Sequence, residues 1–572
     1  MPSAAAAAVR ALPRQRWSRG LLVVVAGLAT GLSWEPYHLW PLLLVGLPAF
    51  TVAICGLPPR RAFAAGYLYG LMTLTLAINW IHVLGFWVAV ALIVFEALFF
   101  GILGLAINLT SRLRLWPLAA ACCWVLVEFT YSRIPFGGFG WTRIAYAVVD
   151  TPLAGFFPFI GVAGVSFLTA LIGQLVAYAV LGWLTRSRDG ASSPGSVERT
   201  TGVRRHPAGV ALALALVLVV AGLGLGLFQL EPAAGELGSV RVGIVQGNVP
   251  GRGIEAMGRA RSVTNNHLSE TINLVARARL GAVGQPDFLL WPENSTDIDP
   301  LQDRQTNAVV RAAAGVAGIP ILVGAVTRGP GSDERQTTAM WWDPQRGVTA
   351  TYQKRNLVPF GEWIPFRKQL LPVLPILEQV GAQSVPGTQP GVMRVQVAGR
   401  DINVGDIICF ELAYDRTVYE TVTGGAQVLM VQSNNATYGG TGQIEQQFAI
   451  TRARAMETRR DIAVATTNSV SGYIDRNGHV QQRTNEFTAQ SLVVDMPLRS
   501  AMTPAVHLAP WLDRGLAAAG LLFVVAGLVG RTRRLEPDRR DQMRDDEALP
   551  GPAERALEPA AGASRSTKGD GR

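Results

Sequence analysis

The sequence predicts a polytopic α-helical membrane domain of about eight spans joined to an extracytoplasmic α/β domain. Three observations predict this fold class. Apolar blocks follow one another almost without a break over residues 20–230 and recur at 510–530. The loops between these blocks alternate between arginine-rich and arginine-poor. Residues 239–500 have the composition of an ordinary globular domain in which strand-like and helical segments alternate.

Eight apolar segments are candidate membrane spans, because a bilayer core about 30 Å thick needs roughly 20 apolar residues in a helix. They lie near residues 20–35, 38–57, 62–81, 85–108, 116–130, 157–184, 208–229 and 510–530. The first, fifth and eighth are marginal in length. The pattern predicts an N-terminal membrane domain of about seven helices over residues 1–230 and a C-terminal transmembrane helix at 510–530.

Arginine placement predicts the orientation of these helices. Arginines gather before span one, between spans two and three, four and five, and six and seven, and after span eight. The loops between the other spans are poor in Lys and Arg. Cytoplasmic loops carry the excess of cationic residues, so we expect both termini in the cytoplasm and residues 231–509 outside. A cleaved signal peptide is the alternative for span one, but no clear small-residue cleavage site precedes span two.

Charge and composition narrow the classes of partner. Arginines that flank the membrane spans account for much of the formal net charge of +10, so no nucleic-acid partner is expected. The sequence contains no Walker loop, zinc-ligand cluster or dinucleotide fingerprint, and we therefore expect no cofactor and no metal. Residues 531–572 are expected to form a cytoplasmic tail, which is predicted to be disordered because it has little apolar material to bury.

The globular part alternates between strands and helices. The strand-like segments are 239–248, 286–297, 319–326, 400–411 and 426–438, with a hairpin at 337–354 and two strands with an Asn-Gly turn at 460–480. The helical segments are approximately 254–280, 302–317 and 443–460. This order predicts an α/β domain of two or four layers. In α/β sheets, functional side chains gather beyond the strand ends.

Cys409 stands near the end of one such strand-like segment. The other three cysteines of the chain lie in apolar spans, so Cys409 is a free thiol in a compartment that favours disulfides. A thiolate is a nucleophile, but the thiol needs an activating neighbour. None of the six histidines lies in a polar strand-end motif, which leaves a Cys–His pair poorly supported. The alternative reading is a buried core cysteine.

Two charged residues are candidates to act with this thiol. Glu293 follows an apolar run and a proline, where desolvation raises a carboxyl pKa toward values useful for a general base. Lys354 is one of three lysines against 48 arginines (51 cationic residues minus 3), which indicates a need for a compact ammonium at this strand end. A loop acid and a plain surface lysine are the alternatives. Glu362 follows in an aromatic loop, a candidate lid or membrane-touching arm, since Trp363 and Phe366 suit the membrane interface.

Four motifs give these residues a context. The sequences "WPE", "YQKRNLVPFGEWIPF", "ICFE" and "SNNATYG" occur in this order between membrane spans. Together with "PFGGFGWTRIAYAVVDTPLAG" at 135–155, they closely resemble the apolipoprotein N-acyltransferase family, a membrane-bound branch of the nitrilase superfamily. The resemblance covers roughly residues 15–530. Any one motif alone would be a weak signal, whereas the ordered set is specific.

The resemblance implies a fold, a location and a reaction. The fold would be a nitrilase-like αββα sandwich over residues 239–500, on the outer side of the bacterial inner (plasma) membrane. Cys409 would attack the sn-1 ester of a phospholipid, typically phosphatidylethanolamine, and become a thioester. Glu293 would be the general base, and Lys354 would stabilise the oxyanion. The acyl chain would then pass to the α-amine of an S-diacylglyceryl-cysteine at an apolipoprotein N-terminus.

The resemblance also implies supporting residues and a further partner. Glu362 would orient the catalytic lysine, and Glu411 would help to shape the site. Phe410 stands where the family often has a tyrosine, so a role for that hydroxyl is in doubt in this chain. Some relatives carry or work beside a polyprenol-phosphate mannosyltransferase, which makes such an enzyme a candidate partner.

Two other functions are alternatives to the acyltransferase. An exported nitrilase-like amidohydrolase would use the same three residues with water as acceptor, but it gives no reason for eight spans. A non-catalytic membrane scaffold or transporter would not need the motifs. Transport is disfavoured because the spans contain few charges, with Glu96 and Glu128 the main exceptions. We expect these two acids to make interhelical hydrogen bonds.

Overall fold

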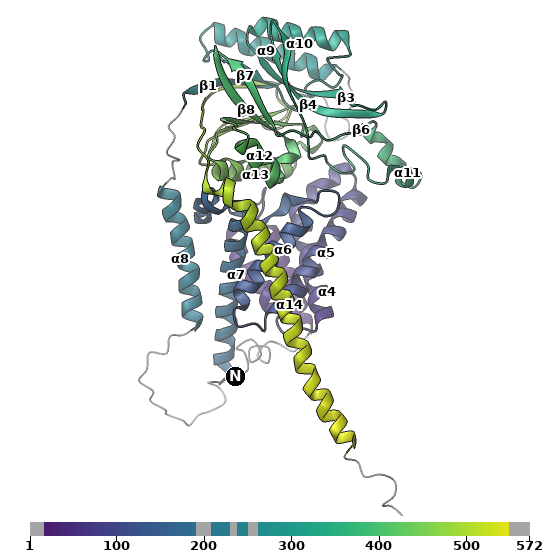
Figure 1. Cartoon of the computed structure of the whole chain (residues 1–572), viewed down its shortest axis with the longest axis vertical. Helices are drawn as coiled ribbons and strands as arrows, with labels where there is room; N and C mark the ends of the chain where they lie inside the picture. Colours follow the sequence, from purple (N-terminus) through teal and green to yellow (C-terminus); the bar gives the residue numbers. More distant parts are fainter. Residues whose placement is uncertain (1–15, 190–206, 229–236, 250–260, 548–572) are drawn as a thin grey trace, which may run out of the picture. The chain divides into compact units, whose positions relative to one another are not determined.

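The computed structural model describes residues 16–189, 207–228, 237–249 and 261–547 (Figure 1). The chain divides into two compact units, residues 1–524 and 525–572. In the second unit, the described part is the C-terminal portion of helix α14 (Pro504–Glu547). This helix continues past the predicted span at 510–530 into the segment expected to be disordered, where six of residues 531–547 are arginine, a good helix former. Residues 548–572 lie outside the described part.

Apolar helices form the N-terminal half. Their bounds are α2 (Arg16–Gly31), α3 (Leu43–Ile54), α4 (Pro59–Ala77), α5 (Phe86–Thr110), α6 (Trp116–Tyr131), α7 (Phe157–Asp189) and α8 (Pro207–Phe228). Each predicted span coincides with a helix, but only four helices within the described residues are long and apolar enough to cross a membrane. These four are Phe86–Thr110, Pro152–Leu184, Pro207–Phe228 and Pro504–Arg531. The prediction of a helical membrane region is confirmed in this coarser form.

Short 3-10 turns explain why several helices are shorter than the apolar segments that predicted them. The turn η1 (Trp40–Leu42) precedes α3, and the turn η2 (Asn79–Leu84) follows α4. Glycines let the longer helices approach closely. A Cβ atom on Gly66 of α4 would lie 2.3 Å from the carbonyl oxygen of Phe100 on α5, and one on Gly104 would lie 2.6 Å from that of Ala62. Such close approaches of a glycine to the backbone of a neighbouring helix are typical of helix packing in membranes.

Two β-sheets form the C-terminal half. The first has the strand order β13-β1-β2-β3-β4-β5, with β6 paired to β4, and the second has the order β12-β11-β10-β9-β8-β7. The strands of the first sheet are β1 (Ser239–Gln246), β2 (Phe288–Leu290), β3 (Ile321–Arg328), β4 (Glu334–Asp343), β5 (Gly347–Gln353), β6 (Gln383–Ser384) and β13 (Gln490–Pro497). Those of the second are β7 (Val392–Val397), β8 (Arg400–Ile408), β9 (Val428–Ser433), β10 (Ile462–Thr466), β11 (Gly472–Ile474) and β12 (Val480–Arg483).

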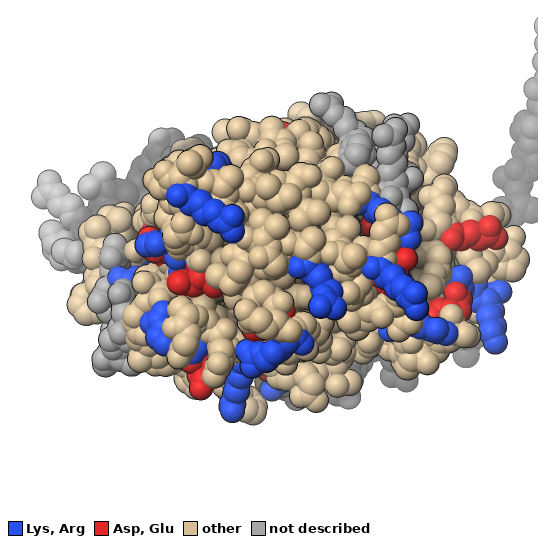
Figure 2. All heavy atoms as spheres, turned by 90° about the horizontal axis from the view of Figure 1, so that it is seen from above, with Lys and Arg blue, Asp and Glu red and all other residues tan. Residues whose placement is uncertain are grey.

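Helices cover the outer faces of both sheets. Helices α9 (Ser262–Arg279) and α10 (Arg304–Ala317) share an apolar core with the first sheet, and a second core fills the space between the sheets. Helices α12 (Asp415–Thr423) and α13 (Gln443–Thr458) pack on the second sheet. The α/β domain therefore has four layers, in the αββα order that the resemblance implied. Cationic and acidic side chains are interspersed on the face of this chain that Figure 2 shows.

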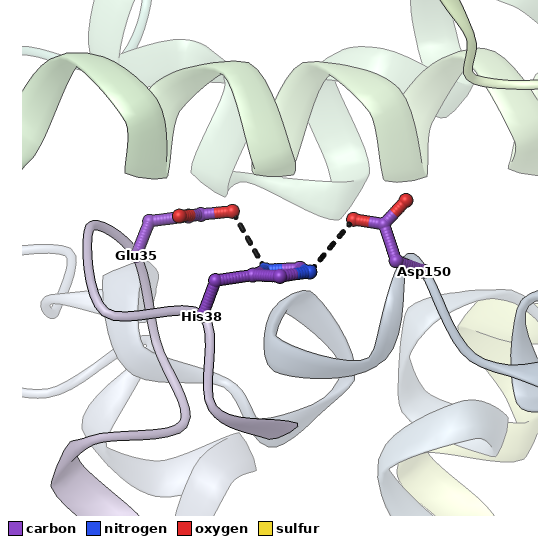
Figure 3. Close-up of side chains that lie close together, drawn as sticks. All are labelled: Glu35, His38 and Asp150. Carbon is purple, nitrogen blue, oxygen red and sulfur yellow. Dashed lines mark ion pairs between the residues drawn. The ribbon is translucent and has the colours of Figure 1, made fainter. Parts of the chain in front are cut away.

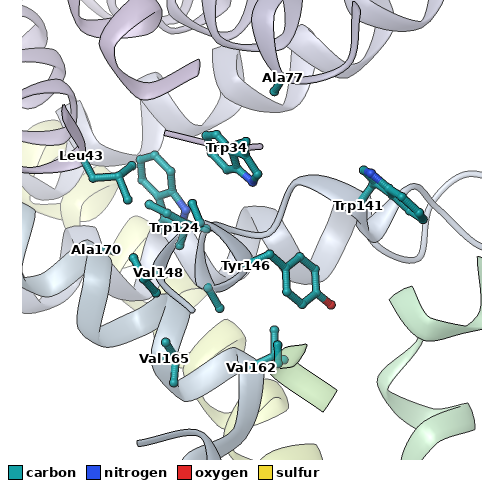
Figure 4. Close-up of a cluster of buried hydrophobic side chains, with 14 of the residues drawn as sticks. Trp34, Leu43, Ala77, Trp124, Trp141, Tyr146, Val148, Val162, Val165 and Ala170 are labelled. Carbon is teal, nitrogen blue, oxygen red and sulfur yellow. The ribbon is translucent and has the colours of Figure 1, made fainter. Parts of the chain in front are cut away.

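The apolar core of α12 and α13 is continuous with that of the helical region. Buried side chains from α6, α7 and the loop after α6 contribute to it, including Trp124, Trp141, Tyr146 and Val162 (Figure 4). Glu128 of α6 accepts hydrogen bonds from Trp124 Nε1 at 3.1 Å and from the backbone N–H of Ile144 at 2.8 Å. It is thus held by hydrogen bonds within its own helix and to the loop after α6, and a side-chain hydrogen bond with Ser166 of α7 also connects it to a second helix, as expected.

Candidate active site

Three strand ends bring a carboxylate, an ammonium and a thiol together. Glu293 follows β2, Lys354 comes directly after β5, and Cys409 comes directly after β8. Lys354 Nζ donates hydrogen bonds to Glu293 Oε1 at 2.9 Å and to Glu362 Oε1 at 3.0 Å. The Cys409 thiol lies close enough to Glu293 and Lys354 for both charges to act on its pKa. The structure therefore places the three predicted catalytic residues, with Glu362, in one group.

The backbone at Cys409 is strained. Cys409 begins the 3-10 helix η8 (Cys409–Ala413) with a φ of +54°, in the left-handed region that non-glycine residues rarely adopt. Such residues persist only where the surrounding structure holds them, often at active sites. Burial and the negative charge of Glu293 raise the pKa of the Cys409 thiol. The thiol is therefore protonated at neutral pH and needs a base before it can act as a nucleophile.

The two neighbouring charges suit different tasks. Burial raises the pKa of Glu293, although the ammonium of Lys354 opposes the shift, and a raised carboxyl pKa suits a general base. Burial alone would lower the pKa of Lys354, but Glu293 and Glu362 outweigh it and hold that pKa above its usual value. Lys354 therefore stays charged and can stabilise an oxyanion. The second oxygens of the two carboxylates are fixed by backbone N–H groups, of Asn434 at 2.8 Å and of Val358 at 2.7 Å.

Glu411 is a fully buried acid that ties two strand ends together. Its carboxylate accepts hydrogen bonds from the Tyr352 hydroxyl at 2.8 Å and from the backbone N–H groups of Arg355 at 2.6 Å, Asn356 at 3.1 Å and Ile408 at 2.9 Å. The first three donors flank Lys354, and the last precedes Cys409. Glu411 thus sets the spacing between the lysine and the thiol.

Family models match both halves of the chain. Residues 26–175 match the apolipoprotein N-acyltransferase N-terminal domain, and residues 241–504 match carbon-nitrogen hydrolase. An apolipoprotein N-acyltransferase from Mycolicibacterium smegmatis is 34% identical over 518 residues, which cover 89% of this chain and 84% of that protein. The chain belongs to the apolipoprotein N-acyltransferase family. It is therefore a membrane-bound acyltransferase of the carbon-nitrogen hydrolase superfamily.

More distant relatives cover almost the same length. An apolipoprotein N-acyltransferase from Pseudomonas aeruginosa (strain LESB58) is 26% identical over 562 residues, which cover 93% of this chain and 99% of that protein. Among solved structures, the chain is similar to an amidase from Nesterenkonia sp., with 20% sequence identity and a TM-score of 0.35 over 48% of this chain and 94% of that chain.

Phe410 lies in an aromatic stack in this N-acyltransferase. Its ring is nearly parallel to those of Trp141, at 5.8 Å and 15°, and Phe139, at 6.1 Å and 24°. The edge of Tyr414 meets it at 5.4 Å. These contacts place Phe410 among apolar rings contributed by the loop after α6, where a ring without a hydroxyl leaves no polar group to satisfy.

The loop that carries Glu362 contacts the same part of the helical region. Phe136 has its ring edge-on to Phe360 at 6.3 Å, Trp363 at 6.0 Å and Phe366 at 5.9 Å. Further along the same segment, apolar side chains are exposed, among them Val373 at 74%. The loop therefore combines an aromatic contact with an apolar surface, as a membrane-touching arm requires.

Sequence reasoning gave no role to Asn434 and Asn435, although both lie in one of the family motifs. They follow β9 directly, and the backbone of Asn434 holds Glu293. The side-chain oxygen of Asn435 lies 4.0 Å from Cys409 Sγ. The signal that could have found them is the one that found Cys409, namely polar residues at the end of a buried strand beside β8.

A separate polar cluster joins two loops of the helical region. His38 Nδ1 lies 2.8 Å from Glu35 Oε1, and His38 Nε2 lies 3.3 Å from Asp150 Oδ2 (Figure 3). These three residues are close enough to hold a metal ion. However, Arg452 of α13 already forms an ion pair with both oxygens of Asp150. The arginine supplies a positive charge where a cation would have to bind, so the residues present do not favour a metal.

Proposed function

We propose that this acyltransferase moves the sn-1 acyl chain of a phospholipid to the α-amine of an S-diacylglyceryl-cysteine at an apolipoprotein N-terminus, through a thioester on Cys409. The observation that carries the proposal is the buried Lys354 ammonium, held between Glu293 and Glu362 beside the strained Cys409. A protonated thiol with an adjacent base and a fixed cation is the equipment that acyl transfer needs.

The first half-reaction forms the thioester. Glu293 takes the thiol proton as Cys409 Sγ attacks the ester carbonyl carbon, and the new oxyanion is stabilised by Lys354. The backbone N–H of Phe410 is a second candidate donor to that oxyanion. The carbon–oxygen bond of the ester then breaks, and Glu293 returns the proton to the leaving alkoxide. The products are a lysophospholipid and an acylated Cys409, with Glu293 ionised again.

The second half-reaction transfers the acyl chain to nitrogen. The neutral α-amine attacks the thioester carbon, and Glu293 takes one amine proton. The carbon–sulfur bond breaks, the thiolate regains the proton, and the amide leaves. Both substrates carry lipid chains, so an α/β domain joined to membrane helices meets them at the bilayer surface. Phosphatidylethanolamine is the expected donor, and a polyprenol-phosphate mannosyltransferase remains a candidate partner.

The proposed location follows from the arginine pattern and the apolar helices. Eight helices would cross the bacterial inner membrane, with both termini in the cytoplasm and the α/β domain on the outer side. The shorter helices Trp17–Gly31, Trp40–Ile54 and Trp116–Tyr131 would cross together with the four longer ones and α4. Support comes from the exposed apolar surface of α8 and from the arginines in alternate loops.

The fate of a labelled acyl chain tests the proposal. The purified protein is incubated with a phospholipid labelled in its sn-1 chain, and a diacylglyceryl-cysteine peptide is then added. We expect hydroxylamine-sensitive label on the protein that moves to the peptide as an amide. Label released only as free fatty acid would instead support the hydrolase, which would use water as acceptor. No label on protein or product would contradict both enzymes.

A further inference from the structure

The amide of Asn435 is a buried polar group that faces the nucleophile. Asn435 is 2% exposed and precedes the short turn η9 (Ala436–Tyr438). Its Oδ1 atom lies 4.0 Å from Cys409 Sγ, at the limit of a hydrogen bond from the thiol. An acceptor in this place has no use in stabilising an oxyanion, because two oxygens that both carry negative charge repel each other. The group can therefore serve only a species that donates a hydrogen bond, such as the thiol itself or an amine.

Neighbouring side chains fix which end of this amide faces the sulfur. Asn435 Nδ2 donates to Gln447 Oε1, and Gln447 Nε2 donates to Ser433 Oγ at 2.6 Å. Gln443 Nε2 lies 3.3 Å from Gln447 Oε1 and 3.5 Å from Asn435 Oδ1. All four side chains are at most 3% exposed. With Gln443 and Gln447 as they are placed, turning the Asn435 amide over would set its nitrogen against Gln443 Nε2 and its oxygen against Gln447 Oε1, so in this network the oxygen lies on the side of Cys409.

The groups around the sulfur therefore include one cation and two acceptors. Lys354 is the cation, Glu293 is the acceptor that can also take a proton, and Asn435 is an acceptor that cannot. An ester that approaches the thiol brings no N–H group to the reacting carbon. A primary amine that approaches the thioester brings two. One of them loses its proton to Glu293, and the other needs a hydrogen-bond acceptor in a buried site.

We propose that Asn435 Oδ1 binds and orients the acceptor amine during the second half-reaction. This inference rests on the proposed function. As the amine nitrogen attacks the thioester carbon, one of its protons passes to Glu293 while the other N–H stays bonded to Asn435 Oδ1. The carbon–sulfur bond then breaks, the Cys409 thiolate regains the proton from Glu293, and the amide N–H is released from Asn435. Gln447 is a positioning residue that acts only through Asn435.

The two half-reactions measured separately test this inference. The substitution Asn435→Ala removes the acceptor oxygen. The rate of thioester formation from a labelled phospholipid is expected to stay within about threefold of that of the unsubstituted protein. The rate of single-turnover transfer to a diacylglyceryl-cysteine peptide is expected to fall about tenfold, which corresponds to the loss of one ordinary hydrogen bond. The share of acyl chain lost as free fatty acid should rise. Thr437→Ala, in the same turn, is the control and should change neither rate.

A pair of substitutions at Gln447 separates orientation from folding. Gln447→Met removes the acceptor that holds Asn435 Nδ2, and transfer to the peptide should slow. Gln447→Glu keeps an acceptor there and should restore transfer, with thioester formation as the check that each variant is folded. The inference is overturned if both half-reactions fall equally in Asn435→Ala, if transfer is unchanged, or if Gln447→Met and Gln447→Glu behave alike. Absence of any thioester on the unsubstituted protein would contradict the proposed function instead.

Discussion

At the scale of single residues, the site depends on a charge that is both compact and buried. Lys354 is 1% exposed and donates to two carboxylates at about equal distance. A planar guanidinium spreads its charge and needs more room than an ammonium. The choice of lysine at this position, in a chain with three lysines and 48 arginines, therefore has a geometric explanation, because a compact ammonium fits between Glu293 and Glu362 and would still reach the proposed oxyanion.

Lys354→Arg is expected to lower the rate of thioester formation by about 10²–10³, the usual effect of losing one oxyanion donor. The rate is measured with labelled phospholipid and no acceptor. Lys368→Arg is the matched control, since Lys368 is an exposed lysine and its replacement should leave the rate unchanged. Full activity of Lys354→Arg would show that any cation suffices at this position.

The pH dependence of thioester formation reports on Glu293. As a base, Glu293 must be ionised, so the rate is low below its pKa and rises with pH through it. Because burial raises that pKa, the acidic limb of kcat/KM should have its midpoint above about 4.3, the ordinary value for a glutamate. Glu293→Gln should abolish the limb together with the activity. A limb at or below the ordinary value would contradict the assignment of Glu293 as a desolvated base.

At the scale of elements, helix α13 connects the nucleophile to the helical region. Arg454 on this helix is fully buried and donates to the carbonyl oxygen of Leu412 at 2.9 Å, three residues after Cys409. It also pairs with Asp415 at 2.7 Å and with Glu457 at 2.7 Å. Glu457 in turn accepts the backbone N–H of Val162 in α7 at 2.8 Å. One helix thus holds the turn after the nucleophile against the apolar helices.

Arg454→Met should destabilise the fold by about 3–5 kcal/mol, because it leaves the buried carboxylate of Glu457 without its cation, whereas Asp415 keeps its ion pair with Arg143 at 2.6 Å. The expected result is a lower midpoint of thermal unfolding in detergent and a smaller folded yield. Arg394→Met replaces an exposed arginine on β7 and serves as the control, which should unfold like the unsubstituted protein. An unchanged midpoint for Arg454→Met would show that the buried ion pairs do not hold the two regions together.

Sequence patterns located most elements of the α/β domain, because apolar residues recur with a different period in strands and in helices, and turn residues separate the elements. The strand-end rule also brought Glu293, Lys354 and Cys409 to one place. The pattern left open whether there are two or four layers, since that depends on how the two sheets pack. β13 pairs antiparallel with β1, from Ser239 opposite Pro497 to Gln246 opposite Gln490. A pairing between strands this far apart in the sequence leaves no local signal.

At the scale of the whole molecule, the orientation in the membrane is the most detailed part of the proposed location. A background with Cys409→Ala leaves three buried cysteines. In this background, Leu280→Cys should react with a membrane-impermeant maleimide in intact cells, because Leu280 follows α9 and is 85% exposed. Arg112→Cys, exposed between α5 and α6, should react only after the membrane is permeabilised. The reverse pattern would place the α/β domain in the cytoplasm and contradict the orientation inferred from the arginines.

The mass of the acyl-enzyme tests the central claim most directly. The protein is incubated, without acceptor, with a synthetic phospholipid whose sn-1 and sn-2 chains differ in length, and its peptides are analysed by mass spectrometry. We predict that the peptide containing Cys409 gains the mass of the sn-1 acyl group, that hydroxylamine removes it, and that Cys409→Ala shows no adduct. An adduct on another residue, or full transfer to the acceptor peptide by Cys409→Ala, would contradict a thioester mechanism at Cys409.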